Sequence, residues 1–265
     1  MLFTQASFVL ALATSAVAAA PIEKRWGGWG SWANHGGRPW WTPSASASYL
    51  EFGKRFPGAD SNAPTCDLSQ AVMPAAPTPL PAPASGLTLS HVAIGRGTQN
   101  YTCDLTNATA VPTATGAKAT LFNVSCIAAD TPDLLAKLPS IALDLPIPSS
   151  DDESSPAYQD MSGHHYFLDA TTPFFNMDTT LHQYGTGRFK KSNGSNAPSD
   201  ALLGTNNQGF GSVQWLKLDA KDSAGQVLQE VYRLNTAGGQ PPKTCQGMPA
   251  AFEVQYSSEY WIWAQ

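Results

Sequence analysis

Residues 212–234 read Ser212-Val-Gln-Trp-Leu-Lys-Leu-Asp-Ala-Lys-Asp-Ser-Ala-Gly-Gln-Val-Leu-Gln-Glu-Val-Tyr-Arg-Leu234, and this stretch decides the fold class. Two segments, 212–218 and 227–234, place aliphatic and aromatic residues among polar ones, a pattern typical of β-strands. The segment between them, 219–225, is polar and ends in glycine, as turn segments do. We therefore predict a β-hairpin.

The same pattern continues outward from the hairpin. Thr131 is a suitable N-cap, Pro132 fits the first helical position and Pro139 ends the segment, so we predict one short helix there. Residues 182–211 are rich in Gly, Asn and Ser and predict a long surface loop. We predict a mostly β chain that forms a single antiparallel β-sandwich or barrel-like domain with one short helix and long loops. Further strand-like segments are 87–94, 117–126, 165–169, 172–177, 252–256 and 260–263.

The N-terminal part predicts export and processing. Residues 1–20 are an apolar run that ends in small residues, typical of a secretory signal peptide. Residues 21–55 contain the dibasic pairs Lys24-Arg25 and Lys54-Arg55 and are rich in Trp and Gly, which indicates a disordered propeptide or an excised peptide product. The mature β domain is then 56–265. We expect a secreted protein of the extracellular space or cell wall.

Composition excludes several classes of partner. Only 13% of residues are charged and the net charge is −5, which gives no electrostatic basis for binding nucleic acid or an anionic membrane. No run of about 18 apolar residues follows the leader, so we expect no membrane span.

Cysteines and sequons agree with export. The four cysteines predict two disulfides, with three possible pairings. We expect Cys103–Cys126, which flanks neighbouring β segments, and Cys66–Cys245, which would tie down the Pro/Ala run 74–85. That run favours an extended arm strapped along the domain. Glycosylation is expected at one or more of four sequon positions, Asn100, Asn107, Asn123 and Asn193.

The segment Gly95-Arg-Gly-Thr-Gln-Asn-Tyr-Thr-Cys103 begins like a dinucleotide fingerprint. The third glycine is replaced by Asn100, and no helix or acidic residue follows where the ribose would need one. We therefore expect no nucleotide cofactor. The two glycines predict a tight bend, which leaves Arg96 and Gln99 available to a ligand.

This segment resembles the signature of a fungal secreted family of unknown function, whose members automatic naming often labels "malate dehydrogenase". Further blocks in the same order support the resemblance, which covers about 66–263. It implies a shared fold and export, but no catalytic residues. The absence of a nucleotide fingerprint argues against the dehydrogenase label. The supporting blocks are 116–122, 163–167, 211–218, 231–239, 242–245 and 256–261.

Histidines and acids predict neither a metal nor a recognisable catalytic set. His164 and His165 are adjacent and point to opposite faces of a strand, so they cannot share a metal. No spacing suits zinc, and no nucleophile elbow is present. Aromatic residues on alternating strand positions favour core packing over a carbohydrate platform. They are Tyr166, Phe167, Trp215, Tyr232, Tyr256, Tyr260, Trp261 and Trp263.

Two glycine-bearing turns, 95–101 and 235–239, each lie beside an arginine. If they meet near His165, they form a site for a carboxylate or sugar hydroxyls, lined by Arg96, Gln99, His165 and Arg233. Alternatively, each arginine satisfies loop carbonyls. We predict a secreted glycoprotein that binds cell-wall polysaccharide. The alternatives are an extracellular hydrolase or lyase and a structural wall or spore-coat component.

Overall fold

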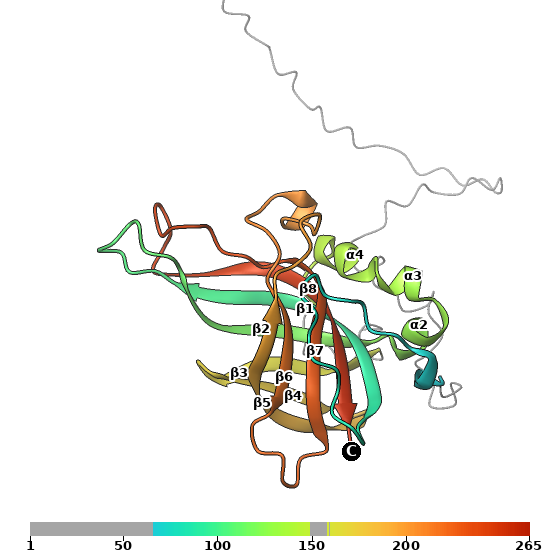
Figure 1. Cartoon of the computed structure of the whole chain (residues 1–265). Helices are drawn as coiled ribbons and strands as arrows, with labels where there is room; N and C mark the ends of the chain where they lie inside the picture. Colours follow the sequence, from blue (N-terminus) through green and yellow to red (C-terminus); the bar gives the residue numbers. More distant parts are fainter. Residues whose placement is uncertain (1–65, 149–157, 159) are drawn as a thin grey trace, which may run out of the picture. The chain divides into compact units, whose positions relative to one another are not determined.

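The computed structural model describes residues 66–148, 158 and 160–265. The predicted signal peptide, the propeptide and the start of the mature domain lie outside the described residues. Eight strands run antiparallel in chain order, and the last pairs with the first to close a barrel (Figure 1). The predicted mostly β antiparallel domain is confirmed, and its architecture is the barrel. The strands are β1 (Thr88–Thr102), β2 (Thr113–Asn123), β3 (Met161–Asp169), β4 (Thr172–Asp178), β5 (Gln183–Ser195), β6 (Trp215–Ala220), β7 (Leu228–Gly238) and β8 (Ala251–Ala264).

The predicted hairpin is strands β6 and β7, which pair with Leu218 opposite Val231. Two other local predictions are wrong. Residues 182–211 are not all loop, because 183–195 form β5. This strand lies between β4 and β6, and its backbone pairs with both of them. Residues 95–101 do not bend, because they lie inside β1, which pairs continuously with β8 along this stretch.

Side chains from alternate strand positions point into the barrel. Ala93 belongs to the inner core, whereas its neighbours Val92 and Ile94 belong to a second core on the outer face. Gly95 faces inward, where a Cβ would overlap the ring of Tyr260. Glycine therefore lets the tyrosine fill the barrel at this level.

Three short helices cover part of the outer face, packed against β1, β7 and β8 (Figure 1). They are α2 (Ser125–Asp130), α3 (Pro132–Leu135) and α4 (Leu138–Asp144). The helix predicted after Thr131 is α3, with Pro132 in its first turn. Pro139 does not end the helical segment, because it lies in the first turn of α4. Backbone N–H groups of a first turn have no partner within the helix, so proline, which lacks this group, fits there.

The Pro/Ala run is strapped along β6 and β7, as predicted, after the short helix η1 (Leu68–Gln70). The carbonyl of Ala82 accepts from Lys217 Nζ at 3.0 Å, and that of Pro81 accepts from Tyr232 Oη at 2.8 Å. The N–H groups of Thr78 and Ala84 also find partners on the barrel wall, in the side chains of Ser195 and Glu230.

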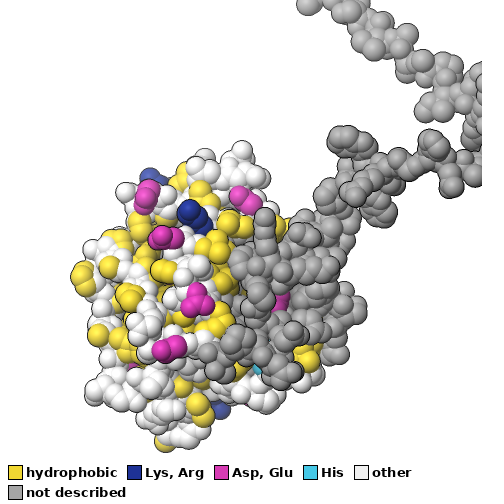
Figure 2. Space-filling model, turned by 90° about the vertical axis from the view of Figure 1, so that its right-hand side faces the viewer, with side chains coloured by type: hydrophobic (Ala, Val, Ile, Leu, Met, Phe, Trp, Pro, Cys, Tyr) yellow, Lys and Arg dark blue, Asp and Glu magenta, His cyan; other side chains and the backbone are white. Residues whose placement is uncertain are grey.

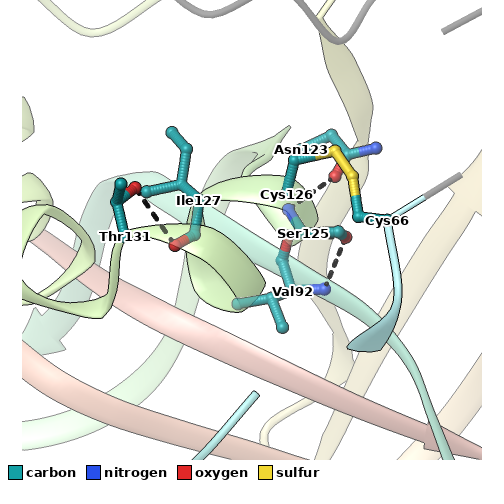
Figure 3. Close-up of a disulfide and its surroundings, with 7 residues drawn as sticks. All are labelled: Cys66, Val92, Asn123, Ser125, Cys126, Ile127 and Thr131. Atoms are coloured by element: carbon teal, nitrogen blue, oxygen red, sulfur yellow. Dashed lines mark hydrogen bonds between the residues drawn. A yellow bond between two sulfur atoms is a disulfide. The ribbon is translucent and has the colours of Figure 1, made fainter. Parts of the chain in front are cut away.

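Both disulfides are present, but their pairing differs from the prediction. The bonds are Cys66–Cys126, with Cα atoms 5.1 Å apart, and Cys103–Cys245, with Cα atoms 5.6 Å apart. Cys126 lies in α2, beside the start of the arm, where the hydroxyl of Ser125 accepts from the Val92 N–H (Figure 3). Cys103 continues β1 beside the segment that enters β8. The pairing of β1 with β8 therefore brings Cys103 to Cys245, and the packing of η1 on α2 brings Cys66 to Cys126; neither contact is visible in the local sequence.

Within the described ranges, no helix has the length and hydrophobicity to cross a bilayer. Figure 2 shows acidic side chains scattered singly over the described part of one face, among hydrophobic and uncharged atoms.

Candidate functional site

Strand register brings three of the four predicted site residues to the inner face of the barrel. Gln99 lies opposite Ala117, and His165 lies opposite Ala119, both core alanines. Arg233 lies opposite Tyr260 on β8. Directly opposed residues of antiparallel strands share a face, so all three side chains start from the interior.

Arg96 lies on the opposite face of the wall, and its predicted place in this site is wrong. It is 3% exposed and fixes the end of the helical segment to the barrel. Its Nε and Nη2 atoms donate to the carbonyl of Leu145 at 3.1 and 2.9 Å, and Nη1 donates to that of Tyr256 at 3.3 Å. Because 95–101 is a strand, residues 96 and 99 point to different faces. Arg96 satisfies carbonyls, as the structural alternative predicted.

His165 is a buried, neutral ring. Its Nδ1 atom lies 3.0 Å from the carbonyl of Phe174, and its ring stacks on Phe175 with centroids 4.3 Å apart. Burial lowers its pKa to about 4, the bond to Phe174 opposes this, and the charge of Arg233 lowers the pKa further. The neutral ring donates through Nδ1 to a carbonyl that can only accept, so Nε2 is left as an acceptor.

Three tyrosines line the same interior. The Tyr256 and Tyr260 hydroxyls are 2.7 Å apart and share one hydrogen bond, while Tyr101 donates to the carbonyl of Gly239 at 2.8 Å. Burial raises the pKa of Tyr101 to about 12 and that of Tyr256 well above its ordinary value. The phenols of Tyr101 and Tyr256 are therefore neutral groups that donate or accept hydrogen bonds at physiological pH.

Two buried polar atoms in this region have no hydrogen-bond partner among the described residues. They are Nε2 of Gln99, a residue 8% exposed, and Oγ of Ser258, a residue 0% exposed. Ser258 follows Tyr256 by two positions and lies opposite Gly95, so it faces inward. Unpartnered buried polar atoms cost free energy, which a polar ligand or an ordered water would recover.

Arg233 supplies positive charge to this interior. Its Nε and Nη2 atoms donate to the carbonyl of Gln214 at 3.3 and 2.9 Å. Its positive charge lowers the pKa of Tyr101, His165 and Tyr256.

Lys191 joins Arg233 at Gln214. Its position on β5 lies opposite inward-facing Leu218, and its side chain, which is exposed, donates through Nζ to Oε1 of Gln214 at 2.9 Å. Neither cation forms an ion pair in the described part of the chain. The arrangement therefore offers positive charge without a resident carboxylate. We name Gln99, His165, Lys191, Arg233, Tyr256, Tyr260 and Ser258 the interior polar cluster.

Sequence reasoning missed Lys191 and Ser258, and it favoured core packing over a carbohydrate platform for the two tyrosines. The spacing of 256, 258 and 260 shows that these residues share a strand face, but not that this face meets His165. Lys191 fell in the predicted loop. Only the register across several strands shows that these residues are neighbours.

The other candidate residues separate into core and surface. Trp215, Tyr232 and Trp261 are buried in the outer core, which confirms packing as their structural role. Asn107, Asn123 and Asn193 are exposed, whereas Asn100 is half-buried in β1. In the described ranges, no three His, Cys, Asp or Glu side chains are grouped to hold a metal ion.

Comparison with known proteins gives a family but no activity. No curated protein and no solved structure matches the chain significantly. One family model matches residues 83–264, which include every strand of the barrel. The chain belongs to the family described as protein of unknown function DUF3455.

Proposed function

We propose that this protein binds a small ligand that carries a carboxylate and hydroxyl groups, held in the interior polar cluster. The observation that carries the proposal is Arg233, which enters the barrel without a carboxylate partner among the described residues, beside unpartnered buried atoms. Eight-stranded up-and-down barrels of this size include proteins that hold one small ligand. The guanidinium matches the planar geometry of a carboxylate.

Each neighbour of Arg233 has a matching role. Lys191 adds a second positive charge, and the amide nitrogen of Gln99, which lies near the Tyr256 hydroxyl, offers a donor. Nε2 of His165 is an acceptor for a ligand hydroxyl, because Nδ1 is engaged with Phe174. Arg233, Lys191 and Gln99 would thus bind hydrogen-bond acceptors of the ligand, and His165 would bind a ligand hydroxyl.

We propose cell-wall carbohydrate as the source of this ligand, in the form of a single acidic sugar at a chain end. A uronic acid combines one carboxylate with several ring hydroxyls, which matches the cluster. The buried outer-core aromatic residues cannot serve as a stacking platform for neutral polysaccharide. The hydrolase or lyase alternative relied on Arg96 together with His165 and Arg233, and Arg96 lies on the other face of the wall.

The test is calorimetric titration of the full chain with glucuronate and, as the matched neutral ligand, glucose. We expect binding of glucuronate only. Arg233→Gln should weaken it at least tenfold, because a charge-assisted hydrogen bond contributes about 1.5–3 kcal/mol. Arg188→Gln, which removes an exposed cation from the outer face, should leave it unchanged. Equal binding of glucose, or no binding of either sugar, would contradict the proposal, and the second result would favour a structural wall component.

A further inference from the structure

The outer face of β2–β5 carries a row of four side chains that the interior cluster does not use. Lys118 on β2 lies opposite Tyr166 on β3, Tyr166 lies opposite Phe174 on β4, and Phe174 lies opposite Arg188 on β5. Their sequence neighbours Ala119, Phe175 and Phe189 belong to the inner core, so these four point outward. We name Lys118, Tyr166, Phe174 and Arg188 the cationic-aromatic row.

This row lies on a part of the wall away from the described helices. The helices pack on β1, β7 and β8 and not in front of β3 to β5 (Figure 1). Lys118 and Arg188 are exposed, Tyr166 is 37% exposed, and Phe174 is half-buried. Aromatic pairs usually lie in a core, so an aromatic pair on the outer wall is a candidate binding surface.

The geometry of the row suits an extended ligand. The rings of Tyr166 and Phe174 meet edge to face, with centroids 5.3 Å apart. Strands lie about 4.8 Å apart, so four adjacent strands spread the row over roughly 14 Å. A cation lies at each end and aromatic rings lie in the middle. An amide and a hydroxyl lie beside the row. The amide belongs to Asn176, two positions from Phe174, and the hydroxyl belongs to Thr186, which lies opposite Asn176.

We propose that the cationic-aromatic row binds an anionic polysaccharide across the strands, with sugar rings on Tyr166 and Phe174 and carboxylates on Lys118 and Arg188. Positive charge at both ends complements a polymer with a carboxylate on each sugar. Among the described residues, Arg188 forms one ion pair, in which its Nη1 atom lies 3.9 Å from Oδ2 of Asp222. Both side chains of that pair are well exposed, so solvent screens the pair and leaves the arginine open to an external anion.

The row favours polysaccharide over single-stranded nucleic acid. Nucleic-acid affinity rises with the number of phosphates neutralised, whereas this row has two cations in a chain of net charge −5. Hydroxyl and amide groups beside the rings match sugar hydroxyls. This surface site is independent of the interior polar cluster, because the row lies on the outer face of the barrel wall and the cluster lies on the inner face.

The experiment measures retention of the full chain on immobilised polygalacturonate by biolayer interferometry, with dextran and oligo-dT as comparison surfaces. We expect binding to polygalacturonate that weakens with added salt, and at least tenfold weaker binding by Lys118→Gln/Arg188→Gln. Tyr166→Ala should weaken binding by a similar factor, while Tyr166→Phe, which keeps the ring, should not. The matched control Lys137→Gln, which removes an exposed lysine of the helical segment, should bind like the unaltered chain.

Two results separate this proposal from the interior site. Arg233→Gln should keep polygalacturonate binding, and the double variant should keep glucuronate binding. Undiminished binding by the double variant, or tighter binding to oligo-dT than to polygalacturonate, would overturn the proposal. Unfolding temperatures identify any variant that fails to fold, in which case Lys118→Gln alone, at an exposed strand position, provides the decisive comparison.

Discussion

Gly97 shows how closely two strands approach at a single residue. A Cβ at this position would overlap the carbonyl oxygen of Lys118 and crowd the backbone of Ala119 on β2. Backbone atoms of a paired strand cannot move aside as a flexible side chain does. Gly95 and Gly97 therefore allow close contacts with the Tyr260 ring and with β2. They do not form the bend that their spacing suggests.

Replacing Gly97 by alanine should destabilise the barrel strongly, by about 3 kcal/mol or more, because relieving the overlap breaks the β1–β2 pairing. Urea unfolding measures the loss. Ser90→Ala, at an exposed position of the same strand, should change the free energy of unfolding by about 0.5 kcal/mol or less. Similar values for the two variants would show that the strands can separate at Gly97 without cost.

His165 links the interior polar cluster to pH. Its pKa is about 4 in the folded chain, against 6.5 for an ordinary histidine, so the unfolded state binds the proton more readily. Its contribution to stability is therefore complete above about pH 6.5 and is lost as the pH falls toward 4. The loss from pH 7 to pH 5 is roughly 2 kcal/mol for this one group.

Measured by urea unfolding at pH 7 and pH 5, His165→Gln should lose less stability on acidification than the unaltered chain. A ring titration followed by NMR should show a midpoint near 4. Equal losses in the two proteins, together with a midpoint near 6.5, would place the ring in contact with solvent.

At the scale of elements, the arm covers an ion pair on the outer face of β6 and β7. Lys217 Nζ lies 3.1 Å from Oε1 of Glu230, and both side chains are less than one-tenth exposed. The backbone of the arm completes the pair, since Ala82 accepts from Lys217 and the N–H of Ala84 donates to Glu230. Packing of the arm and burial of the pair therefore depend on each other.

Glu230→Gln removes the carboxylate closest to the buried lysine charge, leaves only Asp219 at 3.9 Å among the described residues, and should cost about 3–5 kcal/mol. Asp222→Asn, in the exposed pair with Arg188, should cost about 1 kcal/mol or less. Thermal and urea unfolding of both variants test the contrast. Equal small effects would mean that Lys217 reaches water when Glu230 is neutral.

At the scale of the whole molecule, closure of the barrel makes every strand interdependent. Each strand pairs with two neighbours, and β8 pairs with β1, so no strand edge is left open. The arm and the Cys66–Cys126 bond lie outside this ring and fasten onto it. The domain thus divides into a closed ring and a strap, which truncation can separate.

A chain that starts at Phe56 should unfold at the same temperature as the full chain, because it keeps the arm and all four cysteines. A chain that starts at Gly86 lacks the arm and one disulfide, whose 60-residue separation alone contributes roughly 4 kcal/mol in the chain-entropy model. Its melting temperature should fall by about 8 °C or more.

The double variant Cys66→Ala/Cys126→Ala in the chain from Phe56 distinguishes the arm from the disulfide. It should melt between the other two chains, since it keeps the arm contacts. If it melted with the chain from Gly86, the arm would stabilise the domain only through the disulfide.

Local patterns in the sequence determined the hairpin of β6 and β7, the helix start at Pro132, the extended arm and the antiparallel β class. The predicted cap is wrong, because the side chain of Thr131 makes no cap hydrogen bond and donates to the carbonyl of Ile127 instead. The features that were predicted correctly depend on residues close in the chain, where alternation and proline chemistry act directly. Tertiary structure alone decided the disulfide pairing, the inward position of Lys191 and the separation of Arg96 from Arg233. These depend on the register between strands far apart in sequence, and a shift of one residue moves every side chain to the other face. The sequence could therefore identify Gln99, His165 and Arg233 as candidate site residues from their chemistry. Only barrel closure decides which of them meet.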